Sequence, residues 1–384
     1  MSSFRDHFNQ LKNKAEELNK KHNVLPIGQN KPQQQAYSHQ YYPGQHQPQH
    51  SQGQPWQQPP QGQWQQQAPQ PQGQQSYQQQ PPPPNYSTRP GGPPPIPTHS
   101  RPVAPAPAAP ISYGPTVYWR PSFRPEIPVS HEFEHKQGHG DPWGWGNNEL
   151  ENYTSSPANS FHTGDGKLIV RAIAQNAQPD SDARHTSARL VSRATLARAE
   201  GCLTAWLTLP CADGIWPAFW LLPREPFVWP HEGEVDIAES WNGDRQNHSC
   251  LHWGFYTPED AAKHLVRSTH VPDMDRRAVR FNFAWRCAAT ARRPDGKSAG
   301  GGRLMWYIDG RPVMKNLMPP GTRPIEDWVV LLNVAMGGNV CQGKVPQDGA
   351  YDMVVHGLQM SEAVDGGWGR FDNDWQHCAD GAVM

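Results

Sequence analysis

Three carboxylic acids stand within six residues of an apolar segment, as Glu234, Asp236 and Glu239. The Val, Ile and Ala residues between them favour a buried strand, where an unpaired acid is costly enough that it usually has a function. Side chains alternate along a strand, so Glu234 and Asp236 share one face while Glu239 points the other way. One extra residue in a β-bulge would correct this, and we therefore expect a bulge that brings all three acids onto one surface.

A row of three carboxyls has the chemistry of glycoside hydrolysis. That reaction needs one carboxylate to attack the anomeric carbon and one carboxylic acid to protonate the leaving oxygen. A charge on Asp236 would raise the pKa of a neighbouring carboxyl and help to keep it protonated near neutral pH. The alternative is a solvated acidic edge strand, because short acidic patterns also recur by chance.

Five further motifs surround the acids. They are GWGNNELENYT at 144–154, DGKLIV at 165–170, WPAFW at 216–220, WYIDG at 306–310 and LLNVAMGGN at 331–339. Together with the acids, and in this order, they resemble glycoside hydrolase family 16 over roughly residues 118–360. The first motif is most similar to the laminarinase branch of that family, the endo-1,3-β-glucanases.

The resemblance implies a fold and a mechanism. The fold is an all-β jelly-roll sandwich of two antiparallel sheets, concanavalin A-like, whose concave sheet holds an open cleft suited to endo-acting cleavage. Short apolar runs separated by Gly, Pro, Asn and Asp agree with it, and no long helical periodicity follows Val117. The implied roles are nucleophile for Glu234, electrostatic assistant for Asp236, and general acid and then base for Glu239. The implied mechanism is retaining, through a covalent glycosyl-enzyme.

Nine other residues are candidates for binding the glycan, namely Trp145, Asn148, Glu149, Arg189, Trp216, Trp220, Trp241, His252 and Asn333. The resemblance implies the first four, and it places His252 near the cleaved bond, with an isolated core histidine as the alternative. Trp216 and Trp220 are four residues apart and share a face of a regular strand, as a sugar platform or as core. A buried amide at Asn333 must find partners, either a sugar hydroxyl or the backbone.

Several classes of function stay open on this sequence. The first is a β-glucan hydrolase, acting on β-1,3 or mixed β-1,3-1,4 linkages, or a transglycosylase that remodels cell-wall glucan. The second is a lectin-like glycan-binding protein without turnover, which retention of all three acids disfavours. The third assigns the main role to the N-terminal tail as a scaffold. We expect no cofactor and no metal, since no compact set of oxygen ligands is evident for the structural calcium of the family.

Composition divides the chain into unequal parts. Only 35% of the 384 residues are hydrophobic, and the deficit is local, because Gln, Pro, Gly, Ser and Tyr dominate the segment before Pro115. We expect a short amphipathic helix over 1–25, a disordered Pro/Gln/Gly-rich segment over 26–115, the catalytic domain over 116–362, and a C-terminal tail over 363–384.

Charge and short motifs bound the partners. A net charge of −1 gives no electrostatic case for nucleic acid or an anionic membrane, whereas a neutral polysaccharide fits. Pro83, Pro84 and Tyr86 form a PPxY motif of the kind that WW domains bind, although Pro-rich spacers generate such matches freely.

The first thirty residues lack the uninterrupted apolar core of a signal peptide or transmembrane anchor. We therefore expect a cytoplasmic or non-classically exported protein. Its six cysteines show no CxxC pairing, so free thiols are favoured, although an even number permits disulfides. In a protein that is not exported by the secretory route, the glycosylation sequons at Asn152 and Asn247 are chance matches.

Overall fold

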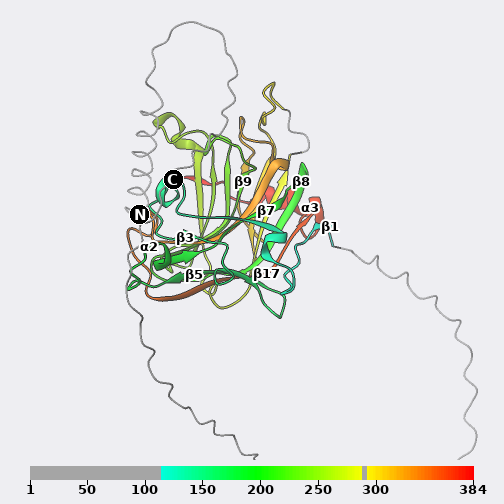
Figure 1. The fold of residues 1–384 in the computed structure, drawn as a ribbon. Helices are drawn as coiled ribbons and strands as arrows, with labels where there is room; N and C mark the ends of the chain where they lie inside the picture. The colour runs from blue at the N-terminus through cyan, green and yellow to red at the C-terminus, as the bar shows by residue number, and fades with distance from the viewer. Residues whose placement is uncertain (1–113, 288–291) are drawn as a thin grey trace, which may run out of the picture. The chain divides into compact units, whose positions relative to one another are not determined.

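Strands dominate the computed structural model, which describes residues 114–287 and 292–384 (Figure 1). The helix expected over 1–25, the PPxY motif and all but the last two residues of the low-complexity segment lie outside that part. Among the described residues, no helix has the length and apolar character needed to cross a membrane.

The first sheet has ten strands, eight of them in the spatial order β15-β14-β13-β8-β17-β5-β6-β3, with β1 paired to β17 and β4 to β5. Their bounds are β1 (Val117–Trp119), β3 (Asn152–Tyr153), β4 (Ser160–His162), β5 (Leu168–Ala174), β6 (His185–Ser187), β8 (Glu200–Thr208), β13 (Val279–Arg286), β14 (Arg303–Ile308), β15 (Arg311–Leu317) and β17 (Gly349–Ser361). Of the strand pairs in the described residues, only β3 with β6 is parallel.

The second sheet has eight strands in the order β18-β12-β11-β10-β9-β16-β7-β2. Their bounds are β2 (Phe133–Lys136), β7 (Arg189–Thr195), β9 (Ile215–Pro223), β10 (Glu234–Glu239), β11 (Gln246–His252), β12 (His264–His270), β16 (Trp328–Met336) and β18 (Ala382–Val383). Helical elements are short: α2 (Ser181–Arg184), α3 (Gly367–His377) and the 3-10 turns η1 (Val129–His131), η2 (Trp143–Gly146), η3 (Pro258–Lys263) and η4 (Ile325–Asp327).

Alternation along the strands builds the core between the two sheets. In β13, Phe281, Phe283 and Trp285 belong to the main apolar core, whereas Ala284 between them packs in a second cluster on the opposite face. This period of two is what a strand requires when both of its faces are covered. The expected all-β sandwich of two largely antiparallel sheets is therefore confirmed.

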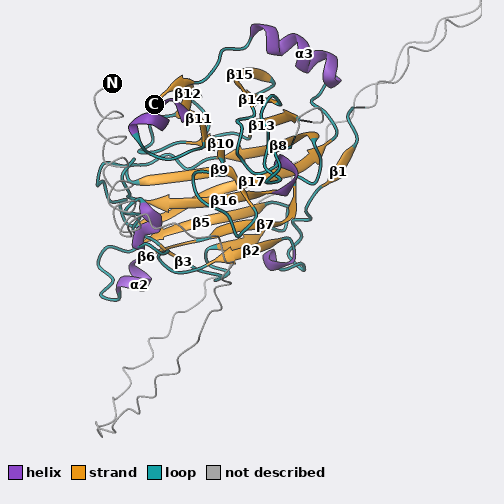
Figure 2. Cartoon of the chain, turned by 90° about the horizontal axis from the view of Figure 1, so that it is seen from above, coloured by secondary structure: helices purple, strands orange, loops and turns teal. Residues whose placement is uncertain are grey.

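The C-terminal residues differ from the tail expected over 363–384. Helix α3 packs Phe371, fully buried, against β13 and β14, with Trp368 and Trp375 partly buried beside it, and Figure 2 shows the helix alongside these strands. Strand β18 then pairs with β12 at the edge of the second sheet. The three aromatic residues recur at i, i+3 and i+7, a helical pattern that Gly367 and Gly369 obscure in the sequence.

Candidate active site

Strand β10 carries the three acids and contains the expected bulge. Its register against β9 pairs Asp236 with Trp220 and Ala238 with Phe219, so one residue of β10 is unmatched. Glu234, Asp236 and Glu239 consequently all line one cleft. The residues between them, Val235, Ile237 and Ala238, are buried in the main core. Because of this one unmatched residue, the three acids line the cleft while the apolar side chains between them face the core, as proposed from the sequence.

Two buried side chains satisfy the backbone that the bulge leaves unpaired. The Asn247 amide donates to the Ile237 carbonyl at 3.2 Å and accepts from the Glu239 N–H at 3.3 Å. From the opposite sheet, the Trp306 indole donates to the Asp236 carbonyl at 2.9 Å. Both side chains are fully buried, so water cannot substitute for them. Asn247 lies inside a glycosylation sequon, and its burial leaves no room for a glycan there.

The cleft has a volume of about 800 Å³ and lies over the second sheet. It brings together nine of the twelve predicted site residues, namely Glu234, Asp236, Glu239, Trp145, Glu149, Arg189, Trp216, Trp220 and Asn333. They come from β7, β9, β10 and β16 and from the segment around η2. Strands far apart in the sequence are therefore needed to assemble it.

Burial controls the protonation of the acids. It raises the pKa of Glu234 to about 7, against the lowering effects of the Trp229 indole and the charge of Arg189. It raises the pKa of Glu239 to about 8, where the Trp216 indole lowers it and the charges of Glu234 and Glu149 raise it further. Near neutral pH, one carboxyl can therefore be ionised while the other keeps its proton.

Asp236 is the third acid of the row, and its pKa is raised as well. Burial, and then the charges of Glu234 and Glu239, raise the pKa of Asp236 well above its ordinary value. The charge of Asp236 is not among the causes that raise the pKa of Glu239. That influence comes from Glu234 and Glu149, because two buried like charges oppose one another's ionisation.

Each of the outer acids accepts a hydrogen bond from an indole. Trp216, on β9, donates to Glu239 Oε1 at 2.6 Å. Trp229, in the loop before β10, donates to Glu234 Oε2. Hydrogen bonds to a carboxylate favour its charged form, so both indoles oppose the effect of burial. From the sequence we expected Trp216 to be a sugar platform or part of the core. In the structure its indole is a hydrogen-bond donor to Glu239.

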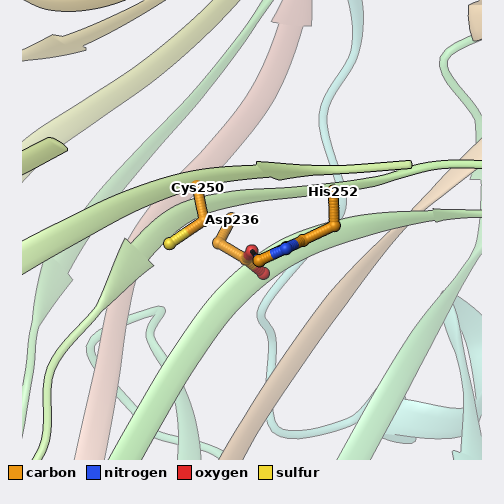
Figure 3. A group of neighbouring side chains, drawn as sticks. All are labelled: Asp236, Cys250 and His252. Atoms are coloured by element: carbon orange, nitrogen blue, oxygen red, sulfur yellow. Dashed lines mark ion pairs between the residues drawn. The ribbon is translucent and has the colours of Figure 1, made fainter. Parts of the chain in front are cut away.

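A second layer of buried groups lies beside Asp236. His252 Nε2 is 3.5 Å from Asp236 Oδ2, and its Nδ1 is 3.1 Å from Nδ1 of His264. His264 Nε2 donates to the Phe255 carbonyl at 3.3 Å. Burial lowers the pKa of His252 to about 3 and that of His264 to about 4, so both rings are neutral near pH 7. Cys250 completes the layer, and Figure 3 shows it with Asp236 and His252.

Arg189 is held between two aromatic rings that line the cleft. Its guanidinium carbon lies 4.5 Å from the Trp145 ring centroid and 4.7 Å from that of Trp220. Arg189 Nε and Trp145 Nε1 are buried and have no hydrogen-bond partner among the residues that the structure describes. Unmet buried donors are rare and call for an explanation, and a ligand that carries hydroxyl groups supplies one.

Asn333 forms hydrogen bonds with two other side chains. Its carbonyl oxygen accepts from the Trp220 indole at 2.7 Å, and its amide donates to the Tyr153 hydroxyl at 3.0 Å. Tyr153 in turn donates to Glu149 at 3.4 Å. These two bonds use one of the two N–H donors and one of the two acceptor positions of the amide. Asn333 therefore orients Trp220 in the cleft wall, and direct contact with a glycan stays a prediction.

Three predicted residues do not line the cleft. Asn148 donates to the Asn339 side chain at 2.6 Å, and its neighbour Asn147 faces the cleft instead. Trp241 stacks on His248 with a centroid separation of 3.7 Å. His252 lies in the buried layer under Asp236. A motif match alone could not resolve these orientations, since they depend on local backbone geometry such as the positive φ of Asn148.

Sequence reasoning missed two aromatic residues at the other side of the acids. Trp229 is 48% exposed and Tyr256 is buried, their ring centroids are 5.6 Å apart, and both line the cleft. They belong to loops before β10 and after β11. The Trp229-Pro230 dipeptide close to Glu234 was the one signal available, because the loop that holds it must fold back over the strand.

Fold and site together define a class: a β-sandwich with a wide cleft whose floor carries paired carboxyls of separated pKa, as in enzymes that act on glycans. A family model described as the XgeA-like catalytic domain of GH16 matches residues 150–288. A glucan endo-1,3-beta-glucosidase of Cryptopygus antarcticus is 36% identical over 218 residues, which are 52% of this chain and 74% of the relative. The chain belongs to glycoside hydrolase family 16.

Two further comparisons give the extent of the likeness. Glucan endo-1,3-beta-glucosidase A1 of Niallia circulans is 25% identical over 262 residues, 62% of this chain and 36% of the relative. The chain thus spans about a third of that relative's length. An endo-1,3-beta-glucanase structure from Streptomyces sioyaensis has a TM-score of 0.53 and 24% identity, covering 66% of this chain and 98% of the other. This last likeness bears on the fold.

Proposed function

We propose that this protein is a retaining, endo-acting hydrolase of β-1,3-glucan. The observation that carries the proposal is the bulged strand β10, which lines one cleft with three acids. Family membership supports the same reaction class, and relatives named for 1,3-β-glucan support this substrate. An open cleft suits internal cleavage, because a glycan can lie across it without a free end.

In the proposed mechanism, the Glu234 carboxylate attacks the anomeric carbon while Glu239 gives its proton to the leaving glycosidic oxygen. The C–O bond to the leaving sugar breaks as the bond to Glu234 forms. Glu239, now a carboxylate, takes a proton from water, whose oxygen attacks the same carbon and releases Glu234. Two inversions give net retention of configuration.

Electrostatics support the change of role at Glu239. The charge of Glu234 raises the pKa of Glu239, and forming the glycosyl-enzyme removes that charge. The pKa of Glu239 must then fall, so the group that began as an acid becomes a base without moving. Asp236, which we propose to be neutral in the free enzyme, lies between them as a polar group that adds no opposing charge.

Glycan binding is proposed for both sides of the acids. Trp145, Arg189 and Trp220 form a stacked wall that offers two unmet donors to sugar hydroxyls. Trp229 and Tyr256 supply aromatic surface at the opposite side, where an apolar pyranose face can stack. An acceptor sugar at that position in place of water would convert hydrolysis into transglycosylation, and mixed β-1,3-1,4-glucan stays an alternative substrate.

The test is turnover of laminarin, lichenan, agarose and xyloglucan by the full chain and by the variants Glu234→Gln and Glu239→Gln. We expect laminarin to be cleaved fastest, into oligosaccharides of mixed length. The Glu239→Gln change should lower kcat by about 10²- to 10⁴-fold, the usual contribution of general acid catalysis. Glu362→Gln, on the opposite sheet, is the matched control and should retain activity. Wild-type turnover by Glu234→Gln, or glucan binding without cleavage by the wild type, would refute the proposal.

A further inference from the structure

Three side chains of different ligand chemistry converge in the layer under the acids. Asp236, Cys250 and His252 lie on the paired strands β10 and β11, where Asp236 is the direct cross-strand neighbour of Cys250 and Glu234 that of His252. All three are buried, and their carboxylate, thiol and imidazole atoms lie within 4.8 Å of one another (Figure 3). Thiolate, imidazole and carboxylate are the ligands that Zn²⁺ takes in proteins.

The hydrogen-bond chain behind His252 aims a lone pair at this group. The Phe255 carbonyl can only accept, so Nε2 of His264 carries the proton of that neutral ring. His264 Nδ1 therefore accepts, and His252 Nδ1 must donate to it. The remaining nitrogen, His252 Nε2, is left with a lone pair directed at Asp236. Metal-binding histidines are oriented in this way, through a donor bond from the other ring nitrogen.

The spacing also fits a shared ion better than a direct bond. His252 Nε2 and Asp236 Oδ2 are 3.5 Å apart, beyond the usual range of a hydrogen bond between nitrogen and oxygen. Two ligands of a tetrahedral zinc, each about 2.0–2.2 Å from the metal, are separated by about 3.3–3.6 Å. The pair is therefore already at the separation that a bound ion requires, and only the thiol has to move inward.

An ion can enter the site from the cleft, and a group that can serve as its fourth ligand lies beside the site. Asp236 lines the cleft, so an ion can reach it from the solvent. Glu239 Oε2 lies 4.0 Å from Cys250 Sγ, which places a further carboxylate beside the same position. Water or this carboxylate can complete the four-coordinate sphere that zinc prefers.

We propose that Asp236, Cys250 and His252 form a Zn²⁺ site that switches the cleft off. Binding displaces the protons of the Cys250 thiol and the Asp236 carboxyl, which leave to solvent. The ion then holds Asp236, which lines the cleft with Glu234 and Glu239, as a ligand and so removes it from the proposed reaction. Inhibition rests on the proposed hydrolase function, whereas binding of the ion does not.

Calorimetric titration of the full chain with ZnCl₂ tests the binding, using Cys250→Ser and Cys250→Ala. Cys202→Ser is the control, since Cys202 is equally buried but lies in the opposite sheet. We expect the Cys250 variants to lose one zinc per chain, or to bind it more than about 100-fold more weakly, beyond the effect of losing an outer partner. Titration with Co²⁺ should give thiolate-to-cobalt absorption in the wild type and in Cys202→Ser alone.

Laminarin cleavage supplies the second readout. Zinc should inhibit the wild type and Cys202→Ser, with recovery on adding a chelator, and should leave folded Cys250 variants active. Zinc binding of equal affinity and stoichiometry in wild type and Cys250 variants would overturn the site, as would the absence of a thiolate–cobalt band. A third result would separate the two proposals. If the protein binds zinc through Cys250 but cleaves no glucan when it is free of metal, the proposed hydrolase function is refuted and the zinc site stands.

Discussion

At the scale of single residues, the two indoles that donate to the outer acids set the balance of the site. Burial alone would raise the pKa of Glu234 and of Glu239 together, and Trp229 and Trp216 each pull one of them back. The nucleophile must be ionised and the acid must be protonated, so activity is confined to the interval between their pKa values. Because the acids interact, the pKa values that a pH profile reports belong to the whole carboxyl cluster and not to single residues. The account predicts a bell-shaped profile of kcat/KM with its maximum between about pH 7 and 8.

Replacing Trp229 by Phe should move the acidic limb of that profile to higher pH. The indole stabilises the ionised form of Glu234, so its loss raises the pKa of the nucleophile, and more base is needed to ionise it. The measurement is kcat/KM for laminarin from pH 4 to 10. Trp143→Phe is the control, because Trp143 is 64% exposed and stacks on His139 away from the acids. An acidic limb that stays in place, or moves down, would contradict this assignment.

Residue types and motifs indicated the acids and also Trp216, Arg189 and Glu149, but not every group that surrounds the acids. Glu234, Asp236 and Glu239 are close in sequence, and a period of two plus one bulge suffices to predict their common face. Trp229, Tyr256 and His264 reach the site through loops and neighbouring strands. Their positions depend on tertiary packing, which no local pattern records.

At the scale of elements, the bulge in β10 is the feature on which the site depends. A regular strand would turn Glu239 into the core and Ala238 toward the cleft. Asn247 and Trp306 hold the irregular backbone by bonding the Ile237 carbonyl, the Glu239 N–H and the Asp236 carbonyl at the bulge. These two residues therefore support the geometry of the acids without contacting a substrate.

Asn247→Ala should weaken both the fold and the site. It leaves the Ile237 carbonyl and the Glu239 N–H buried without partners, at about 1–3 kcal/mol each. We expect a lower free energy of unfolding in urea and a lower kcat from the folded protein. Asn282→Ala is the matched control: this buried amide bonds Thr204 in the other sheet, so it should cost stability alone. Equal kcat in both variants would argue against a role for Asn247 at the bulge.

At the scale of the whole molecule, the folded unit extends through the C-terminus. The all-β class was predictable from the short apolar runs, and the two antiparallel sheets from the resemblance to the family. Helix α3 and strand β18 were not, because two glycines and a short length weaken the helical signal, while β18 spans only Ala382–Val383. We propose that residues 116–384 form the catalytic unit, with its C-terminal residues covering β13 and β14.

The Phe371→Ala variant measures how much helix α3 contributes to the free energy of unfolding. The side chain is fully buried against the outer face of the first sheet, so its removal should cost about 3–5 kcal/mol of unfolding free energy. Denaturant unfolding gives the value, and the pH profile of the folded variant should match the wild type, since α3 packs on the outer face of the first sheet whereas β10 belongs to the second sheet. A loss within about 0.5 kcal/mol, as at a surface position, would mean that the helix does not stabilise the fold.

The central claim is that Glu234 and Glu239 cleave a β-1,3-glucan with retention of configuration. Proton NMR of the first products of laminarin cleavage tests it most directly, because the new reducing end shows its anomeric form before mutarotation equilibrates it. The account predicts that the β-anomer appears first and that the α-anomer follows at the rate of mutarotation. Initial release of the α-anomer would mean inversion, and would contradict the nucleophilic role of Glu234 and the paired-carboxyl mechanism built on β10.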